Sequence, residues 1–403
     1  MMVRAHRVPI LHRAEGLRVT HPTTPTSRTH LDNGGRASWH PLARTAFLQA
    51  LDDGWADPRR LHTEGRRAAA LLDGAREAVA AVLGARTEEV RFTPSHTASL
   101  HTAVAQVARA RRRHGGDVVV SAVERAAVLH AADHVLPAGR RRVTVPVDRH
   151  GRVDVDAYAA VLSARDVALA ALQHANGEVG TTQPVEAVHE AARAAGVPLL
   201  VDAGASLGHA AVGPAWDVLA ADPADWGAPS GVGVVAVRHR TRTVATGPED
   251  PEPWAPGGVS VPAAFAAAVA LQAVAEDRAQ ADARRRALVE KIRARVADIP
   301  DVEVVGDPAD RLPHVVTFSF LYVDGEALVT ELDRAGFAVG SGSACTAGTL
   351  EPSHVLAAMG VLTHGNVRIA LDRSTTAEDV DRFLDVLPGA VARVRDMLGV
   401  RGL

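Results

Sequence analysis

One thiol and one amine are unique in this chain, and each brings its own chemistry. The 403-residue sequence has a single cysteine, Cys345, and reading along it gives a single lysine, Lys291. Cys345 lies among small residues, in the stretch 340–350, just before a helix that we predict to begin near Glu351. An accessible thiol near a helix start can have a lowered pKa and act as a nucleophile. The alternative interpretation is a small buried side chain that only packs.

Lys291 limits the classes of enzyme that the chain can represent. A lysine amine can form a Schiff base with a carbonyl compound, whereas an arginine guanidinium stays protonated and delocalised. Of the 44 Lys and Arg residues, only Lys291 offers that amine. It stands inside a long helical pattern, 262–299, where we expect an ordinary solvated residue. No lysine is therefore expected to be available for covalent catalysis.

Composition excludes several other functions. The formal net charge is −3, so no basic excess favours nucleic-acid binding, and no apolar run approaches the ~18–20 residues of a membrane span. The first 20 residues lack the apolar core of a signal peptide. One cysteine excludes an internal disulfide framework and fits a reducing compartment. We therefore predict a cytoplasmic protein with no nucleic-acid or membrane partner.

Strand-like and helical segments alternate from about residue 65, which predicts an α/β fold with a mainly parallel sheet. Ligands bind such sheets at the loops that leave the carboxyl ends of the strands. The loops of interest surround Ser95, Glu124, Asn176, Asp202 and Asp225. We divide the chain into a flexible extension (1–28), a large α/β domain (29–261), a linking helix (262–300) and a small α+β domain (301–403) that carries the Cys345 loop.

Residues 340–356 closely resemble the active-cysteine loop of the cysteine desulfurases, in the class V aminotransferase group of pyridoxal-phosphate (PLP) enzymes. Further segments match that family in the same order: 30–33, 92–97, 121–128, 174–184, 201–203 and 231–233. The resemblance covers roughly residues 29 to 400. It implies PLP-transferase fold type I, with a seven-stranded, mainly parallel sheet in the large domain, and a homodimer.

The resemblance also implies roles for particular positions. In that family a lysine holds PLP as a Schiff base, and the loop cysteine takes sulfur from the substrate as a persulfide. Here residues 222–231 match the lysine segment without a gap, which puts Asp225 at the lysine position and Asp222 at that of a phosphate-binding serine. Arg125 stands in place of the ring-stacking histidine. Two carboxylates so close to a dianionic phosphate would disfavour its binding.

Four other positions match the family's contacts. Asp202 corresponds to the partner of the PLP pyridinium nitrogen, Asn176 to a contact with the ring hydroxyl, and Thr97 to a phosphate contact at a helix N-terminus. Arg368 corresponds to the arginine that binds the substrate carboxylate. An alternative interpretation is a metal or acid–base cluster, whose spacing matches no metal motif; it would consist of Asp202, Asp222, Asp225, His96 and His101.

Three functional hypotheses remain open. In the first, the chain is a desulfurase homologue that has lost Schiff-base catalysis and serves as an accessory subunit for another protein. In the second, Cys345 carries persulfide sulfur for a sulfur-transfer or biosynthetic partner. In the third, the chain binds PLP non-covalently and catalyses desulfurase, aminotransferase-type or repurposed chemistry. We do not expect ordinary cysteine desulfurase activity, and we expect no metal.

Overall fold

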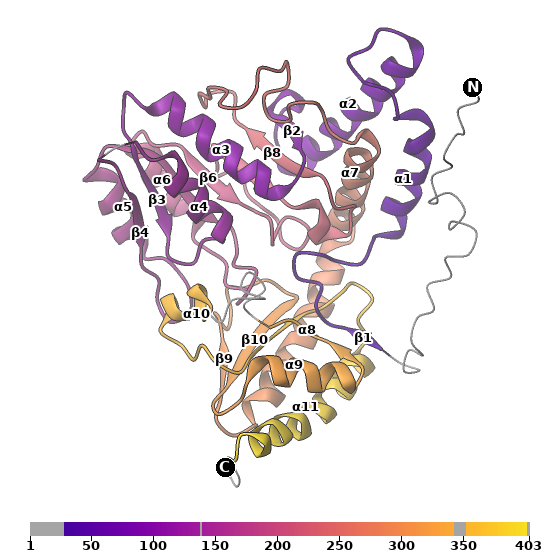
Figure 1. Cartoon of the computed structure of the whole chain (residues 1–403), viewed down its shortest axis with the longest axis vertical. Coiled ribbons are helices and arrows are strands. Elements are labelled where there is room, and N and C mark those ends of the chain that lie inside the picture. Colours follow the sequence, from indigo (N-terminus) through magenta and orange to yellow (C-terminus); the bar gives the residue numbers. More distant parts are fainter. Residues whose placement is uncertain (1–27, 138, 342–351, 401–403) are drawn as a thin grey trace, which may run out of the picture.

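The computed structural model describes residues 28–137, 139–341 and 352–400. Residues 1–27 of the expected N-terminal extension (1–28) and Cys345 lie outside these residues. Figure 1 shows a larger unit built on one broad sheet and, below it, a smaller unit made by the C-terminal elements. No helix in the described part of the chain is long and apolar enough to cross a membrane.

The larger unit contains the predicted seven-stranded sheet. Its strands, in spatial order, are β2 (Val90–Thr93), β8 (Gly233–Val237), β7 (Val218–Ala221), β6 (Leu199–Asp202), β5 (Val167–Gln173), β3 (Asp117–Ser121) and β4 (Arg142–Val145). Strand β8 runs antiparallel to both of its neighbours, and the other described pairings are parallel. The mainly parallel α/β sheet predicted from the sequence is thus confirmed.

Helices cover both faces of this sheet, as its fully buried strands require. On one face lie α3 (His96–Arg111) and α4 (Ala126–Val135). The other face is covered by α2 (Thr63–Leu83), α5 (Val155–Ser163), α6 (Val185–Ala194) and α7 (Val261–Glu276), with α1 (Pro41–Asp53) packed on α7. Successive strand residues point to opposite faces, so Val118 and Val120 belong to the first core and Val119 to the second.

The smaller unit is an antiparallel sheet of order β12 (Asn366–Ala370), β10 (Val315–Phe320), β9 (Val302–Val305). Its helices are α8 (Arg278–Ala297), α9 (Gly325–Arg334), α10 (His354–Met359) and α11 (Ala377–Met397). A short strand, β1 (Thr29–His30), pairs in parallel with β11 (Phe337–Ala338), and the following Leu31 is fully buried in the core of this unit. Residues 29–31 therefore pack with the C-terminal elements, although the sequence places them in the large domain.

The linking helix also differs from its prediction. The structure divides 262–300 into α7 and α8 at Asp277, which ends one helix and precedes the other. Helix α7 buries small alanines against α1 and α2, whereas α8 contacts α11 and the smaller sheet. A carboxylate oxygen of Asp277 accepts a hydrogen bond from Arg373 at 2.8 Å. The break thus falls where the segment changes its packing partners.

Candidate functional site

Loops at the carboxyl ends of the strands gather the polar residues that the sequence singled out. Strand β6 ends at Asp202, Asn176 follows β5, and Arg125 follows β3. Beyond β7 the chain forms a short 3₁₀ helix, η3 (Pro223–Trp226), which begins after Asp222 and contains Asp225. This is the edge at which open α/β sheets place ligands.

Asp202 is held by two basic side chains of the same chain. Nε2 of His96 lies 2.9 Å from its Oδ1, and Nε of Arg125 donates to its Oδ2 at 3.1 Å. The amide of Gly204 adds a hydrogen bond at 2.8 Å. Burial opposes ionisation of Asp202, but the charges of His96 and Arg125 prevail and hold its pKa below the ordinary value. Both carboxylate oxygens are therefore engaged.

The ring of His96 occupies space that only a glycine opposite it leaves free. A Cβ on Gly204 would lie 2.2 Å from Cε1 of His96, so the imidazole rests directly on that backbone. His96 is the first residue of α3 and is 4% exposed. The sequence named His96 as a member of the alternative metal or acid–base cluster, and the structure places it against Asp202.

Asn176 and Thr97 have different surroundings. The side-chain oxygen of Asn176 accepts hydrogen bonds from the amides of Glu178 and Val179, at 2.8 and 2.9 Å, and its nitrogen donates to the carbonyl of Val123 at 3.1 Å. Asn176 thus fixes the turn after β5. Thr97 is exposed in the first turn of α3, and the N-cap of this helix is Ser95.

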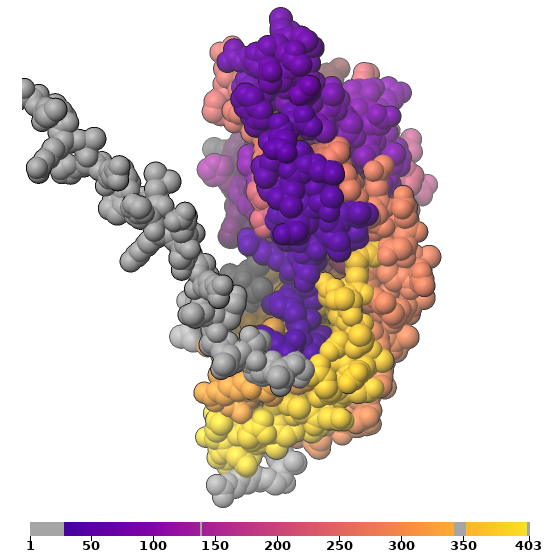
Figure 2. Space-filling model, turned by 90° about the vertical axis from the view of Figure 1, so that its right-hand side faces the viewer, coloured from indigo at the N-terminus to yellow at the C-terminus, as the bar shows by residue number. Residues whose placement is uncertain are grey.

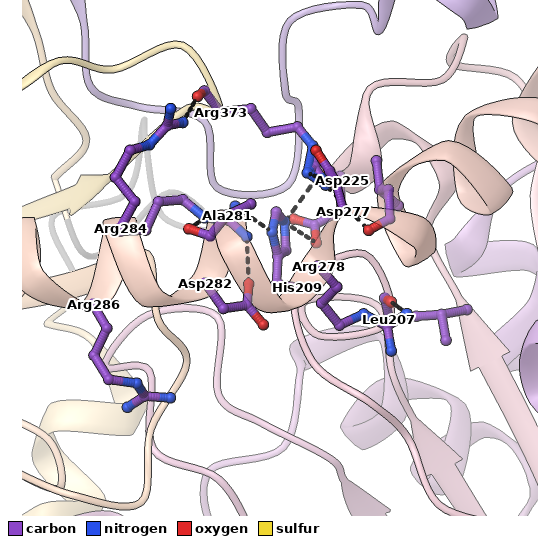
Figure 3. A network of polar contacts seen from close by, with 12 residues as sticks. Leu207, His209, Asp225, Asp277, Arg278, Ala281, Asp282, Arg284, Arg286 and Arg373 are labelled. Atoms are coloured by element: carbon purple, nitrogen blue, oxygen red, sulfur yellow. Dashed lines mark hydrogen bonds and ion pairs between the residues drawn. The ribbon is translucent and has the colours of Figure 1, made fainter.

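Asp225 lies in a buried polar network (Figure 3). Its side chain is 2% exposed, and its Oδ1 accepts a hydrogen bond from the amide of Gly35 at 3.0 Å. Its Oδ2 and its main-chain oxygen each lie 3.1 Å from Nε2 of His209. Nη1 of Arg285 on α8 is 2.9 Å from Nδ1 of the same ring, and Arg285 also bonds Asp282 at 2.7 Å.

Two further groups shape this network. The ring of His209 stacks on that of His314 with centroids 3.7 Å apart, and burial followed by neighbouring positive groups lowers the pKa of His314 far below its ordinary value. Burial raises the pKa of Asp222; the Asp225 charge also raises it, while His96 opposes the shift. His209 and Arg285 carried no sequence signal, because only tertiary packing brings them to Asp225.

Arg368 lies on β12, at the boundary between the two units. Its Nη2 bonds Oδ1 of Asp32 at 2.7 Å, and its guanidinium packs where a Cβ on Gly34 would be. Its side chain is 9% exposed, and its Nε has no hydrogen-bond partner among the described residues. The backbone of Arg368 bonds that of Gly340, which begins the segment leading to the Cys345 loop.

Two buried carboxyl groups were not predicted as site residues. Burial raises the pKa of Glu124 to about 8, although hydrogen bonds from Gln173 and Ser121 oppose the shift. Burial likewise raises the pKa of Glu178 to about 7, against a hydrogen bond with Ser353 and the charge of Arg368. Near neutral pH the Glu124 side chain is therefore expected to be mostly protonated and that of Glu178 about half protonated.

The ends of the cysteine loop reach this site. Ser353 caps α10, and Nε2 of His354 lies 2.9 Å from the main-chain oxygen of Glu124. Cys345 itself is outside the described residues. Lys291, in contrast, lies on α8 and forms an ion pair with Asp381 of α11.

The structure brings His96 and Asp202 of the alternative cluster into contact, but among the described residues the cluster does not form a metal site. His101 lies one turn into α3, and its pKa is lowered by burial and then by the charges of His130 and His134 of α4. Within residues 28–137, 139–341 and 352–400, no three His, Cys, Asp or Glu side chains are arranged to hold a metal ion.

Comparison with known proteins shows the family of the chain. Residues 30–383 match the family described as aminotransferase class-V. The chain is 38% identical over 383 residues to a cysteine desulfurase of Cereibacter sphaeroides, covering 91% of this chain and 97% of that protein. It is 32% identical over 378 residues to the cysteine desulfurase NifS of Azotobacter vinelandii, covering 91% and 94%.

Solved structures give the same result for the fold. A NifS-like protein superposes with a TM-score of 0.83 at 24% identity, covering 93% of this chain and all of that one. DndA from Streptomyces lividans superposes with a TM-score of 0.71 at 26% identity, covering 83% and 98%. The sheet and its strand-end site define the PLP-dependent transferase fold. Together with the sequence matches, they place the chain in the class-V aminotransferases, where it belongs to the cysteine desulfurase family.

Proposed function

We propose that this chain is a cysteine desulfurase homologue that no longer forms a Schiff base with PLP. We propose further that it serves as an accessory subunit or as a carrier of persulfide sulfur on Cys345. The observation that carries the proposal is Asp225, a buried carboxylate at the position that corresponds to the family's lysine. Its contacts with Gly35 and His209 make it an integral part of the fold.

The location of the chain's one lysine supports the same proposal. Lys291 is the one lysine of the chain, and its ammonium is paired with Asp381 between α8 and α11. An imine requires a free amine at the cofactor's aldehyde carbon. At the position that corresponds to the family's lysine stands Asp225, and a carboxylate cannot form an imine.

The remaining site residues do not fit the pyridine ring and phosphate of PLP. Asp202, which would pair with a pyridinium nitrogen, already holds His96 and Arg125. Asp222 and Asp225 add carboxyl groups where the phosphate would bind. Burial raises the pKa of Asp222, and neither residue supplies a positive charge for the phosphate. We therefore derive no catalytic step through PLP.

Absorbance of the purified protein tests the loss of the Schiff base. We expect no yellow chromophore that borohydride reduces, even after incubation with excess PLP. A reducible chromophore on the wild-type chain would refute the proposal. A desulfurase relative with an intact lysine, treated in parallel, provides the positive control.

Sulfur transfer requires only Cys345 and a persulfide donor. The Cys345 thiolate attacks the terminal sulfur of the donor persulfide, a new S–S bond forms, and the donor cysteine leaves as a thiolate. The exchange needs no external oxidant or reductant. The described residues on either side of the loop support this role, because His354 contacts Glu124 and Gly340 bonds the backbone of Arg368.

A reconstituted transfer assay tests this role. An active desulfurase is charged with labelled cysteine, and label on the present chain is measured after removal of the donor. We expect uptake by the wild type and none by Cys345→Ser or by wild type alkylated beforehand. Equal labelling of the serine variant would refute a carrier role for Cys345 and leave the accessory role.

We also propose a homodimer, in which α1 contributes to the contact. The side chains of Leu48 and Leu51 are 50% and 47% exposed, one turn apart on the same face of this helix. Trp55, just beyond its end, is 70% exposed. The N-terminal helices cover much of the face in Figure 2. Exposed apolar side chains grouped in this way are typical of association surfaces.

One alternative keeps PLP as a non-covalent ligand. It is favoured by the ionised Asp202 and by the exposed first turn of α3 at Thr97, which offers backbone N–H groups to a phosphate. Calorimetric titration of PLP, with and without cysteine, tests this alternative. Binding in either titration would support it, and absence of heat in both would exclude it.

A further inference from the structure

A cavity of about 480 Å³ lies at the edge of the seven-stranded sheet opposite to that of Asp202. Pro198 and Asp217, which line it, directly precede the parallel strands β6 and β7, whereas Asp202 ends β6. The rest of the lining comes from the ends of α3 and α6 and from the segment that follows β8. The cavity is therefore separate from the candidate functional site.

The charged lining of this cavity is mostly basic, although the net charge of the whole chain is −3. It holds one carboxylate, Asp217, and five basic side chains: Arg111, His114, Arg193, Arg240 and Arg242. Asp217 is already neutralised, because one of its oxygens accepts hydrogen bonds from Nε and Nη2 of Arg240 at 3.2 and 3.0 Å. Its other oxygen accepts from the amide of Leu199 at 3.0 Å. Four of the five basic groups thus have no carboxylate among the residues that line the cavity.

Two arginines of this lining have no contact that holds the fold. Arg193 and Arg242 are exposed and line the cavity, and neither side chain has a hydrogen-bond or ion-pair partner among the described residues. Burial and the charge of Arg193 lower the pKa of His189, although Asp217 opposes the shift. The unpaired guanidinium groups therefore give the cavity a positive potential, and their N–H groups are free to donate to a ligand.

The backbone around the cavity is fixed by contacts between its walls. Nη2 of Arg111 donates to the carbonyl of Gly196 at 2.8 Å, which joins the end of α3 to the turn after α6. The hydroxyl of Thr241 donates to the main-chain oxygen of Asp217 at 3.3 Å. The amide of Val244 donates to a carbonyl of α3 at 3.1 Å. The unpaired arginines thus project from walls whose relative positions are already set, which lowers the cost of ordering them around a ligand.

We propose that this cavity binds a small anion that contains a diphosphate group. A guanidinium presents paired N–H donors that match the oxygens of a phosphate, so Arg193 and Arg242 each bind one phosphate. The volume lies within the range of about 300–1,000 Å³ that is typical of small-molecule sites. Among the described residues that line the cavity there is no Phe, Tyr or Trp on which a nucleobase could stack. Recognition therefore depends on the phosphates and not on the rest of the ligand.

Titration calorimetry at fixed ionic strength, without divalent cations, tests the proposal on the full-length wild-type chain. The probes are pyrophosphate; ADP, which adds a nucleoside; adenosine, which lacks phosphate; and succinate, a dicarboxylate of lower charge. We expect similar affinities for pyrophosphate and ADP, no binding of adenosine, and binding of succinate at least about tenfold weaker. Absence of pyrophosphate binding, or equal affinity for succinate, would overturn the proposal. Binding of adenosine as tight as that of ADP would place recognition on the nucleoside and would also overturn it.

Variants that remove one charge locate the site. Arg193→Gln and Arg242→Gln each remove an unpaired guanidinium without breaking a contact of the fold, so each should weaken pyrophosphate binding about tenfold, as the loss of one charge-assisted contact does. Arg109→Gln removes the same charge from an exposed position of α3 outside the cavity, and its affinity should stay within about twofold of that of wild type. Equal weakening in all three variants would show a diffuse effect of charge and refute the assignment. Unchanged affinity in both cavity variants would place the binding elsewhere and refute it as well.

A further pair of variants leaves every arginine in place. Ala110 lines the cavity from the last turn of α3, so Ala110→Glu puts a competing carboxylate on its wall. Ala110→Gln, of the same length without the charge, is the matched control. We expect loss of pyrophosphate binding in the glutamate variant only, and binding retained there would overturn the proposal. These readouts involve no chromophore or persulfide, and the cavity lies at the other edge of the sheet, so they succeed or fail independently of the proposed function.

Discussion

Asp225→Lys tests whether the carboxylate has become part of the fold, so that a lysine can no longer take the position. The variant removes the acceptor of the buried Gly35 amide, which should lower the free energy of unfolding by about 1–3 kcal/mol. It also puts an ammonium beside His209, whose other ring nitrogen faces Arg285, at a residue that is 1% exposed, and an unpaired charge there costs about 3–5 kcal/mol. These costs overlap, so we expect a loss of about 4 kcal/mol in unfolding free energy.

Urea unfolding followed by tryptophan fluorescence measures this loss, because Trp226 is buried next to the substitution. Asp225→Asn keeps the oxygen that accepts from Gly35 and should lose only about 1 kcal/mol. In the lysine variant we expect neither a borohydride-trapped PLP adduct nor release of sulfur from cysteine, because His96 still engages Asp202. A lysine variant as stable as wild type, with desulfurase activity, would refute the reasoning.

Three further predictions concern other parts of the chain. Burial raises the pKa of Glu124 from 4.5 to about 8, so its neutral form stabilises the fold at low pH and that contribution falls as the pH rises between these values. Unfolding free energy should therefore decline less steeply with pH in Glu124→Gln. Lys291→Arg should preserve the pairing with Asp381, with a stability change within about 0.5 kcal/mol and unchanged visible absorbance. Leu48→Asp combined with Leu51→Asp should sediment as a monomer.

Each of these has a result that contradicts it. The Glu124 prediction is wrong if wild type and variant show parallel stability profiles across about pH 5–9. A loss of colour or of borohydride-trapped adduct in Lys291→Arg would mean that this lysine reaches a cofactor. If the double α1 variant still sediments as a dimer, α1 does not form the contact; Arg67→Gln on α2 is a surface control that should not alter the sedimentation of the wild-type assembly.

The sequence was most informative where strands are continuous apolar runs. Runs rich in β-branched residues predict strands at 117–121, 302–305 and 315–320, and β3, β9 and β10 have these limits, because polar or turn residues end each run. Strand β7, Val218–Ala221, was not predicted, because four consecutive apolar residues show no alternation between apolar and polar positions. The sequence pattern does not predict helix α1, which exposes its leucines. It predicts a last helix over 376–387 that ends before Pro388, whereas α11 continues to Met397.

The candidate site was predictable only in part. Strand ends and the family pattern drew attention to Asp202, Arg125 and Asp225, and all three lie at the same edge of the sheet. The ion pairs between Asp202 and its two basic neighbours could not be predicted, because side-chain direction depends on packing. His209 and Arg285 are 76 positions apart, and their contact arises from the docking of α8.

The pairing of β1 with β11 limits how this protein can be divided. Leu31 fills the core of the C-terminal unit although it belongs to the opposite end of the chain. A fragment that begins at residue 301 would lack that side chain and expose an unpaired strand edge, so it should aggregate or fold poorly. A circular permutant that joins residue 400 to residue 28 and opens the chain at the exposed loop near residue 246 would keep both contacts. The natural unit for domain swaps with relatives is accordingly 278–400 together with 28–35.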